Sequence, residues 1–404
     1  MDKKVLIEKV KTHLEVLCSD IPERRVGSAG NRQATAYAKK VLEESGWQTE
    51  ETKLSVIDWE TDGAKLTCNG QSFEVFSSHY SLGCSVQGEL IAVDTVAKLE
   101  KTDIQDKILL MYGEITSQQI APKNFPFWNP AEHQHIISIL EHGKPKALIC
   151  ATERNSSTAG GVYPFPLFED GDFDIPSVYM KDTEGERLFA CVGKRVELES
   201  KARRIPETAF NITGHKSSQA KDRIVITAHI DAKIGTPGAI DNATGVAVIL
   251  LLAEMLRDNS GKYPIELVAF NGEDYYAASG QVKYVEQNIG KFNDIFLNIN
   301  IDGAGYKEGP SGFSAFELPV KIRKALNEVI RDNAGIVEGL PWYQGDHSLF
   351  LQNGLPAIAV SSQWFVENME CQEITHTPKD NLEIVSYESV VECAIGIKEL
   401  INKL

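Results

Sequence analysis

The amino-acid sequence predicts an α/β fold: a mixed, largely parallel central sheet flanked by helices and interrupted by a smaller mixed β domain. Three observations carry this prediction. A chain of 404 residues is too long for one ordinary core. After residue 204, apolar runs alternate with helical segments, which is typical of a sheet covered by helices on both faces. Between about residues 76 and 205, short β-type runs are separated by polar loops instead.

The amino-terminal region begins with two helical patterns, over residues 5–18 and 30–46, and the second ends at Gly46 as a carboxyl-terminal cap. Strand-like alternation follows over 48–57 and 64–68. Asn69 and Gly70 then indicate a hairpin turn. We assign residues 1–75 and 206–404 to one domain and residues 76–205 to an inserted domain.

The inserted region contains β-type runs near residues 88–93, 107–112 and 147–151 and one helix over about 130–142. A loop rich in Gly, Pro and Phe covers 159–176. His133, His135 and His142 lie on or beside the helix, and we interpret them as surface or packing histidines. No cluster of catalytic residue types is found in this part of the sequence.

The carboxyl-terminal region repeats strand, loop and helix. Its apolar runs predict strands at 223–228, 265–270, 295–301 and 357–360, and its helical patterns cover 243–256, 320–334 and 389–403. The strands are almost continuously apolar, which favours burial on both faces of the sheet.

Composition excludes several classes of protein. A formal net charge of −16 argues against a nucleic-acid partner, because phosphate binding needs clustered Lys and Arg. No apolar run approaches the ~20 residues of a membrane span, and the start of the chain lacks the apolar core of a secretory signal. The seven cysteines never form a Cys-x-x-Cys pair, which favours free thiols in a reducing compartment. We therefore expect no membrane association and a cytoplasmic location.

Polar residues follow three of the predicted strands at the point where each strand ends. His229 and Asp231 follow the first strand, Glu273 and Asp274 the second, and Asp302 the third. The carboxyl ends of strands in an open α/β sheet share one crevice, where ligands bind. A cluster of carboxylates in that crevice repels itself unless cations neutralise it. The pattern therefore predicts a metal site.

Asp241 and His376 extend this set. Asp241 stands just before the helix from residue 243, where the cap of that helix is the alternative role. His376 lies in a loop, where polar surface is the alternative. Thr375, Thr377 and Asp380 offer hydrogen bonds that would orient its ring.

These residues stand in six short segments whose order spans about residues 224–385. The segments are His229–Asp231, Gly238–Asn242 with Asp241, Asn271–Asp274 with Glu273, Asn300–Asp302, Asp346–His347 and His376–Asp380 with Pro378. Together they resemble the M28 family of metallopeptidases, which includes bacterial leucyl-type aminopeptidases and glutamate carboxypeptidase. Residues 25–31 with the following helix resemble the amino-terminal region of that family. Residues 76–205 resemble the protease-associated domain that some members carry.

The resemblance implies a zinc-exopeptidase fold and two divalent metal ions, most simply zinc. His229, Asp241 and Asp302 would hold one ion, and Asp241, Asp274 and His376 the other. Glu273 matches the general acid/base, and Asp231 matches the carboxylate that orients His229. Three Asp ligands and a hydroxide that bridges the metals would neutralise four positive charges, as a buried site requires. Histidine and carboxylate ligands suit zinc, and manganese or cobalt also fit.

The implied activity is a metal-dependent exopeptidase that hydrolyses peptide bonds with the bridging hydroxide, and an aminopeptidase is expected first. A carboxypeptidase or dipeptidase would need a cationic pocket for a terminal carboxylate. A glutaminyl-cyclase-type transferase, which uses one zinc ion, and a binding module without activity are two less favoured possibilities. Peptides are the expected partners, and the sequence predicts no oligomeric state.

Three positions depart from the family pattern or remain open. Many relatives carry two Glu residues where this chain has Glu273 and Asp274, so the shorter Asp274 places the second metal nearer the backbone or makes its coordination less bidentate. We interpret Asp346 and His347 as supporting residues. Trp342 or Tyr343 lies where some relatives place a tyrosine that helps to stabilise an oxyanion, and a packing aromatic is the alternative.

Overall fold

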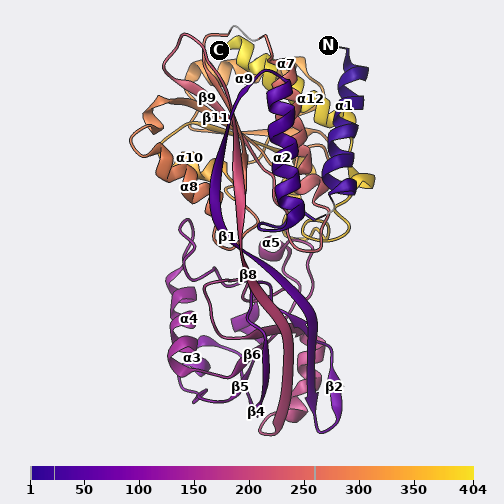
Figure 1. Cartoon of the computed structure of the whole chain (residues 1–404), viewed down its shortest axis with the longest axis vertical. Coiled ribbons are helices and arrows are strands. Elements are labelled where there is room, and N and C mark those ends of the chain that lie inside the picture. Colours follow the sequence, from indigo (N-terminus) through magenta and orange to yellow (C-terminus); the bar gives the residue numbers. More distant parts are fainter. Residues whose placement is uncertain (1, 22, 259–260) are drawn as a thin grey trace. The chain divides into compact units, whose positions relative to one another are not determined.

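A computed structural model describes residues 2–21, 23–258 and 261–404 of the chain. The chain forms two compact units (Figure 1). The larger unit comprises Met1–Val56 and Thr208–Leu404, and the inserted unit comprises Ile57–Glu207. The sequence placed these boundaries after residues 75 and 205. Two long strands, β1 (Gln48–Cys68) and β8 (Arg195–Lys216), pass from one unit into the other, so neither boundary coincides with a loop.

The larger unit is built on one sheet with the strand order β13-β12-β14-β11-β9-β10-β8. Its other strands are β9 (Arg223–His229), β10 (Ile265–Phe270), β11 (Ile295–Ile301), β12 (Ser311–Phe316), β13 (Ile336–Glu338) and β14 (Ala357–Ser362). Strand β9 pairs in parallel with β10 and β11, and β11 pairs in parallel with β14. The pairs of β8 with β10 and of β12 with β14 are antiparallel. This mixed, largely parallel sheet confirms the predicted fold class.

Helices cover both faces of this sheet. They are α1 (Lys3–Glu15), α2 (Ala29–Glu44), α7 (Thr244–Met255), α8 (Ser279–Asn288), α9 (Val320–Asp332), α10 (His347–Gln352), α11 (Gln363–Glu367) and α12 (Tyr387–Lys403). Helices α1, α2, α7 and α12 lie on one side of the sheet, and α8 and α10 lie on the other (Figure 1). Helix α7 is buried all round from Thr244 to Ala253 because neighbouring helices cover the side that faces away from the sheet.

The predicted helices and strands of the larger unit are found with small shifts. Helix α2 begins after Ser28, whose hydroxyl accepts a hydrogen bond from the main-chain nitrogen of Asn31. It ends before Gly46, where φ is +77°. Helix α1 continues into a π-helical turn, η1 (Val16–Asp20). Sequence reasoning missed β8, β12, β13, α8, α10 and α11. All of these except β8 are too short or too rich in Gly, Ser and polar residues for a clear periodic pattern.

Strand β1 differs from the prediction of two strands, since it runs without a break from Gln48 to Cys68. Polar side chains at its centre stay exposed while the backbone remains extended, and Trp59 between them is buried. Asn69 and Gly70 form the predicted turn, with φ of 51° and 79°. The turn joins β1 to the antiparallel strand β2 (Gln71–Phe73).

The inserted unit contains a second mixed sheet. Strands β4 (Cys84–Val93), β5 (Ile108–Met111), β6 (Ala147–Thr152) and β7 (Ser177–Lys181) are parallel, and β3 (Phe76–Ser77) and β8 pair antiparallel at its two ends. The predicted helix is α4 (Ala131–Gly143). Three further helices are too short to show a helical period in the sequence: α3 (Val96–Leu99), α5 (Ser156–Ala159) and α6 (Asp182–Leu188).

Single helical turns complete the set of elements. They are η2 (Gly113–Thr116) and η3 (Phe189–Cys191) in the inserted unit and η4 (Ala239–Ala243), η5 (Phe292–Asp294) and η6 (Leu382–Ile384) in the larger unit. In α4, Nδ1 of the buried His133 lies 3.0 Å from the main-chain nitrogen of Ala121, so this histidine is a packing residue. His135 and His142 lie at the surface, where they pair with Glu100 and with the main chain of Ser138.

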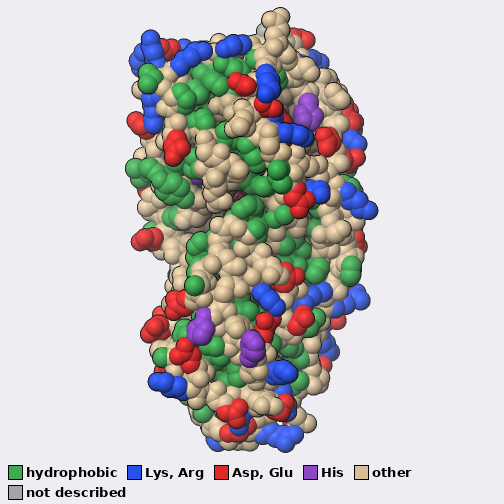
Figure 2. All heavy atoms as spheres, turned by 90° about the vertical axis from the view of Figure 1, so that its left-hand side faces the viewer, with side chains coloured by type: hydrophobic (Ala, Val, Ile, Leu, Met, Phe, Trp, Pro, Cys, Tyr) green, Lys and Arg blue, Asp and Glu red, His purple; other side chains and the backbone are tan. Residues whose placement is uncertain are grey.

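The surface mixes charges of both signs. On the face drawn in Figure 2, basic and acidic side chains alternate over both units. All seven cysteines are free thiols. Among the helices that the structure describes, none is both long enough and apolar enough to span a bilayer.

Candidate metal centre

Three neighbouring parallel strands deliver the predicted site residues to one edge of the larger sheet. His229 is the last residue of β9, and Asp231 follows it. Glu273 and Asp274 lie in the turn after β10, and Asp302 directly follows β11. Because β10, β9 and β11 are adjacent and parallel, these residues emerge side by side at the carboxyl ends of the strands.

Asp241 reaches the same edge from η4, ahead of α7. Its backbone is not helical, with φ of −118° and ψ of 83°, and the peptide bond to Asn242 is cis. Ala243, not Asp241, stands at the cap position of α7, so the cap interpretation is wrong. The carboxylate of Asp380 accepts hydrogen bonds from the main-chain nitrogens of Ile240 (2.7 Å) and Asp241 (3.0 Å), which fix this turn.

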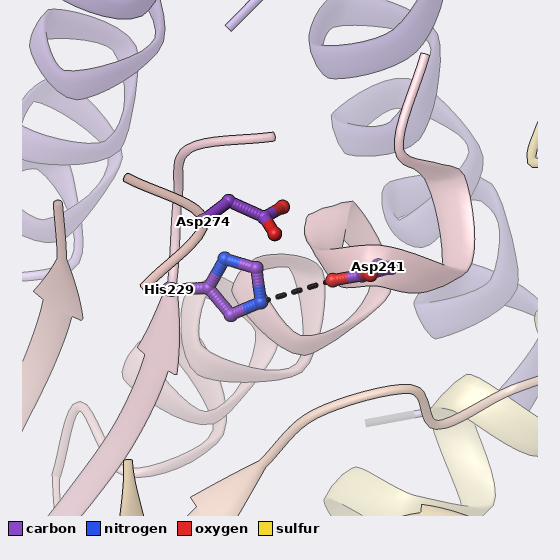
Figure 3. Close-up of side chains that lie close together, drawn as sticks. All are labelled: His229, Asp241 and Asp274. Atoms are coloured by element: carbon purple, nitrogen blue, oxygen red, sulfur yellow. Dashed lines mark ion pairs between the residues drawn. The ribbon is translucent and has the colours of Figure 1, made fainter. Parts of the chain in front are cut away.

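The two oxygens of the Asp241 carboxylate face two different histidines. Oδ1 lies 3.1 Å from Nε2 of His229, and Oδ2 lies 3.1 Å from Nε2 of His376. A second carboxylate lies near each of these histidine nitrogens. Oδ1 of Asp302 lies 3.6 Å from Nε2 of His229, and Oδ1 of Asp274 lies 3.3 Å from Nε2 of His376. Figure 3 shows His229, Asp241 and Asp274 facing one another. The five predicted ligands therefore form two groups that share Asp241.

The unused polar atoms of this cluster fit metal ions. Nε2 of His229 and Oδ2 of Asp274 are buried and make no hydrogen bond. Buried polar atoms are nearly always paired, so two unpaired atoms that face one small space indicate a missing partner. Ligand atoms of His229, Asp241 and Asp274 all lie within 4.8 Å of one another. Imidazole and carboxylate donors of this kind suit zinc and related divalent ions.

The electrostatics of the cluster also favour added positive charge. Burial raises the pKa of Glu273 well above its ordinary value, and the charges of Asp274, Asp302 and Asp346 raise it further. Burial likewise raises the pKa of Asp302, with further contributions from Asp241 and Asp274. Burial disfavours the charged form of His376, but the carboxylates of Asp274 and Asp241 outweigh it and raise its pKa. Divalent ions would relieve the repulsion among these carboxylates.

Asp231 holds the turn that carries Glu273 and Asp274. Its carboxylate accepts hydrogen bonds from the main-chain nitrogens of Gly272 (2.8 Å) and Asp274 (3.0 Å). Nδ1 of His229 lies 3.2 Å from the main-chain oxygen of Asp231 and 3.7 Å from its Oδ1. The nearer main-chain oxygen, more than the carboxylate, therefore orients the ring of His229, which leaves Nε2 facing Asp241.

The loop that carries His376 is arranged differently from the prediction. His376 itself has a positive φ of 64°. The hydroxyl of Thr377 donates to the main-chain oxygen of Ile374, and that of Thr375 accepts from Gln372. The carboxylate of Asp380 accepts its hydrogen bonds from main-chain nitrogens of the η4 turn. These groups therefore shape the loop and the position of Asp241 instead of bonding to the His376 ring.

Further polar and aromatic residues surround the cluster. Asp346 is buried, accepts a hydrogen bond from Gln281 of α8 at 2.8 Å, and has a pKa raised by burial to about 7. Sequence reasoning missed Gln281, because a single glutamine on a helix carries no signal. Nε2 of the buried His347 lies 2.8 Å from the main-chain oxygen of Trp342, which agrees with a supporting role.

Trp342 and Tyr343 have different environments. Trp342 is 8% exposed and packs against His347, and Tyr343 is 66% exposed. A Cβ atom added at Gly345 would lie 3.0 Å from the Trp342 ring and 3.2 Å from Oδ2 of Asp302. Gly345 therefore lies between the Trp342 ring and the carboxylate of Asp302, with no room for a side chain.

The fold and the cluster define a zinc-exopeptidase type of α/β domain with a candidate two-metal centre. Comparison with known families agrees: the model of peptidase family M28 matches residues 211–401. Residues 211–401 therefore match the M28 peptidase family, and this range contains the six segments on which the resemblance in the sequence rests.

The chain is also similar to individual aminopeptidases, in sequence and in structure. Aminopeptidase YwaD of Bacillus subtilis is 24% identical over 240 residues, which cover 55% of this chain and 50% of that protein. The chain thus spans about half the length of the curated relatives it matches. Among solved structures, the aminopeptidase from Aneurinibacillus sp. strain AM-1 has a TM-score of 0.75 at 20% identity and covers 100% of this chain and 92% of its own. A zinc aminopeptidase from Bacillus subtilis has a TM-score of 0.75 at 20% identity, with 98% and 94% covered.

Proposed function

We propose that this protein is a metal-dependent aminopeptidase that binds two divalent ions, most simply zinc. The observation that carries the proposal is the placement of the Asp241 carboxylate, with one oxygen 3.1 Å from each of two histidines. Asp302 and Asp274 complete the two groups. Two complete ligand sets favour a two-metal hydrolase over a glutaminyl cyclase that uses one zinc ion and over a binding module without activity.

Different residues of the chain would bind the metal ions and transfer protons. His229, Asp241 and Asp302 would hold one ion, and Asp241, Asp274 and His376 the other. The bound ions supply an activated water molecule and a polarised scissile carbonyl. Glu273 takes the proton from the attacking water and passes it to the nitrogen of the leaving amine, so a single carboxyl serves as base and then as acid.

The charges around the cluster support action at a free amino terminus. The charge of Asp346 raises the pKa of Glu273, so these two carboxyls, neither of them a proposed metal ligand, lie near each other at the site. Their negative charge would attract the ammonium group of an amino-terminal residue and disfavour a terminal carboxylate. A carboxypeptidase would require the opposite charge at this place.

A panel of peptides tests the proposal. The purified chain, loaded with zinc, is assayed on aminoacyl amides, on the same peptides with a blocked amino terminus, and on peptides with a blocked carboxyl terminus. We expect turnover that requires a free amino terminus, tolerates a blocked carboxyl terminus and stops when a chelator is added. Turnover of amino-blocked peptides alone would instead identify a carboxypeptidase.

A cytoplasmic location stays part of the proposal. It is supported by the seven free thiols, four of which have pKa values that burial raises to about 11 or higher. Thiols of this kind are kept reduced in the cytoplasm. Cell fractionation with an antibody against the chain tests the location, and recovery outside the cytoplasm would contradict it.

A further inference from the structure

The amino-terminal segment Arg24–Asn31 lies outside the region matched by the family model, yet it contacts the loops that carry the metal ligands. Arg24 is 1% exposed, although its side chain carries a full charge. Its guanidinium donates to four main-chain oxygens: Leu17 (2.6 Å), Ile230 (3.1 Å), Pro237 (2.7 Å) and Gly238 (2.8 Å). A buried arginine is costly unless such bonds satisfy it, so its bonds have a structural purpose.

Three of these oxygens belong to the loop between β9 and α7, which begins directly after the predicted ligand His229 and contains the predicted ligand Asp241. Ile230 directly follows His229, and Pro237 and Gly238 precede Asp241 by a few residues. The planar guanidinium therefore ties the beginning of this loop to its end, a geometry that the single ammonium of lysine does not match. The Asp380 carboxylate, on which the charge of Arg24 also acts, accepts hydrogen bonds from the main-chain nitrogens of Ile240 and Asp241.

Gly238 makes this close approach possible. Its φ is +58°, and a Cβ atom there would lie 3.0 Å from a guanidinium nitrogen of Arg24 and 2.5 Å from the main-chain oxygen of Asp241. The loop thus passes between the guanidinium and the turn that carries Asp241 with no room for a side chain.

Asn31 makes a second connection, to the turn after β10. Its side-chain amide and that of Asn271 form a reciprocal pair, with hydrogen bonds of 2.9 Å and 2.8 Å, and both residues are completely buried. The Nδ2 group of Asn31 also donates to the main-chain oxygen of Arg24. Asn271 lies two residues before Glu273 and three before Asp274, so the pair fixes the point from which that turn begins.

We propose that Arg24 and Asn31 are positioning residues of the metal centre. Arg24 fixes the loop that follows His229 and carries Asp241, and Asn31 fixes the turn that carries Glu273 and Asp274. The inference rests on the proposed metal centre, and it adds a part of the chain that none of the metal ligands occupies. The inference predicts different effects of the two residues. A change at Arg24 should affect both ions, because Asp241 belongs to both ligand groups, and a change at Asn31 should affect one ion, because Asp274 belongs to one group.

Cobalt binding tests the proposal without any measurement of activity. The full chain is stripped of metal and titrated with Co²⁺, and the visible absorption of cobalt reports the number and geometry of its ligands. Arg24→Met removes the charge, Arg24→Lys keeps the charge with fewer donors, and Asn31→Ala removes the amide pair. Arg204→Met is the matched control, because Arg204 of the inserted unit also donates to main-chain oxygens, and those oxygens belong to its own unit (Tyr80, Asp170 and Phe173).

We expect Arg24→Met to weaken binding of both cobalt ions by about 10- to 100-fold and to change the spectrum, as substitutions behind metal ligands do. Arg24→Lys should restore part of the affinity. Asn31→Ala should weaken one of the two ions and leave the other unchanged, and Arg204→Met should leave both unchanged. Circular dichroism and a melting curve of each metal-free variant show that it is folded at the temperature of the titration.

Several outcomes would overturn the inference. One is that a folded Arg24→Met chain binds cobalt with the affinities and the spectrum of the unchanged chain. If Arg24→Met does not fold, the same result for folded Arg24→Lys and Asn31→Ala chains would overturn the inference. Another is an Arg204→Met chain that loses affinity to the same degree, because the effect would then reflect general loss of stability. If the unchanged chain bound no cobalt, the metal centre and this inference would both fall. Normal cobalt binding without peptidase activity would contradict the proposed function alone.

Discussion

At the scale of single residues, the centre depends on groups with similar chemistry and different surroundings. The carboxylates of Asp231, Asp241 and Asp380 are all buried or nearly so. Asp231 and Asp380 accept hydrogen bonds from main-chain nitrogens, so their oxygens are occupied. Asp241 and Asp274 direct oxygens toward the histidines instead. Hydrogen bonding therefore separates the carboxylates that shape the site from those that can bind a metal.

Glu273 can be tested separately from the ligands. Glu273→Gln keeps the shape of the side chain but removes the group that accepts a proton. We expect the variant to bind two metal ions as the unchanged chain does and to lose about 10²- to 10⁴-fold in kcat, the usual contribution of general acid–base catalysis. Metal analysis and steady-state kinetics on an aminoacyl amide measure the two effects. Glu308→Gln, at an exposed position, is the control. A variant that retained full kcat would exclude Glu273 as the base.

At the scale of helices and strands, a buried histidine joins α1 to α2. His13 of α1 is 5% exposed, and its Nδ1 lies 2.7 Å from the hydroxyl of Tyr37 in α2. Its other ring nitrogen is buried without a hydrogen-bond partner. Burial lowers the pKa of His13 to about 4, so the ring stays neutral in the folded protein at pH values where the unfolded chain, with a pKa of about 6.5, is protonated.

The sign of the pH effect follows from linkage. Between pH 6.5 and 4 the unfolded chain binds a proton that the folded chain does not, so acid lowers the free energy of unfolding. From pH 7.5 to pH 5, His13 accounts for a loss of about 2 kcal/mol. His13→Phe should reduce the pH dependence of the unfolding free energy by that amount. Urea titrations at both pH values with a chelator present, which removes the effect of metal release, measure it. An unchanged pH dependence would assign the acid sensitivity to other groups.

The elements also show how far the sequence alone could predict this protein. Apolar strands followed by His229, Asp274 or Asp302 were recognisable because strand ends and metal chemistry both leave local patterns. Gln281, Arg24 and Asn31 were not, since their partners Asp346, Ile230 and Asn271 lie far away in the sequence and only the folded chain brings them together. The arrangement of the His376 loop was also mispredicted, because several nearby hydroxyls could have bonded to the ring and the backbone used them instead.

At the scale of the whole molecule, the five predicted ligands come from separate places in the larger unit. The ends of β9 and β11, the turn after β10, the η4 turn and the loop before α12 each contribute one. Unfolding separates these segments and abolishes the metal groups. Metal binding to the folded state alone therefore stabilises the protein, by about 2.7 kcal/mol for each ion at a free metal concentration 100 times its Kd.

Calorimetry of the full chain tests this coupling. The larger unit is in the size range in which 1 kcal/mol shifts Tm by about 2–4 °C, so each zinc ion, at 100 times its Kd, should add about 5–10 °C to the Tm of the larger unit over the chelated protein. Asp241→Asn removes the carboxylate that both groups share, and its Tm should hardly respond to zinc. Equal zinc shifts in both proteins would show that the stabilising ions bind elsewhere.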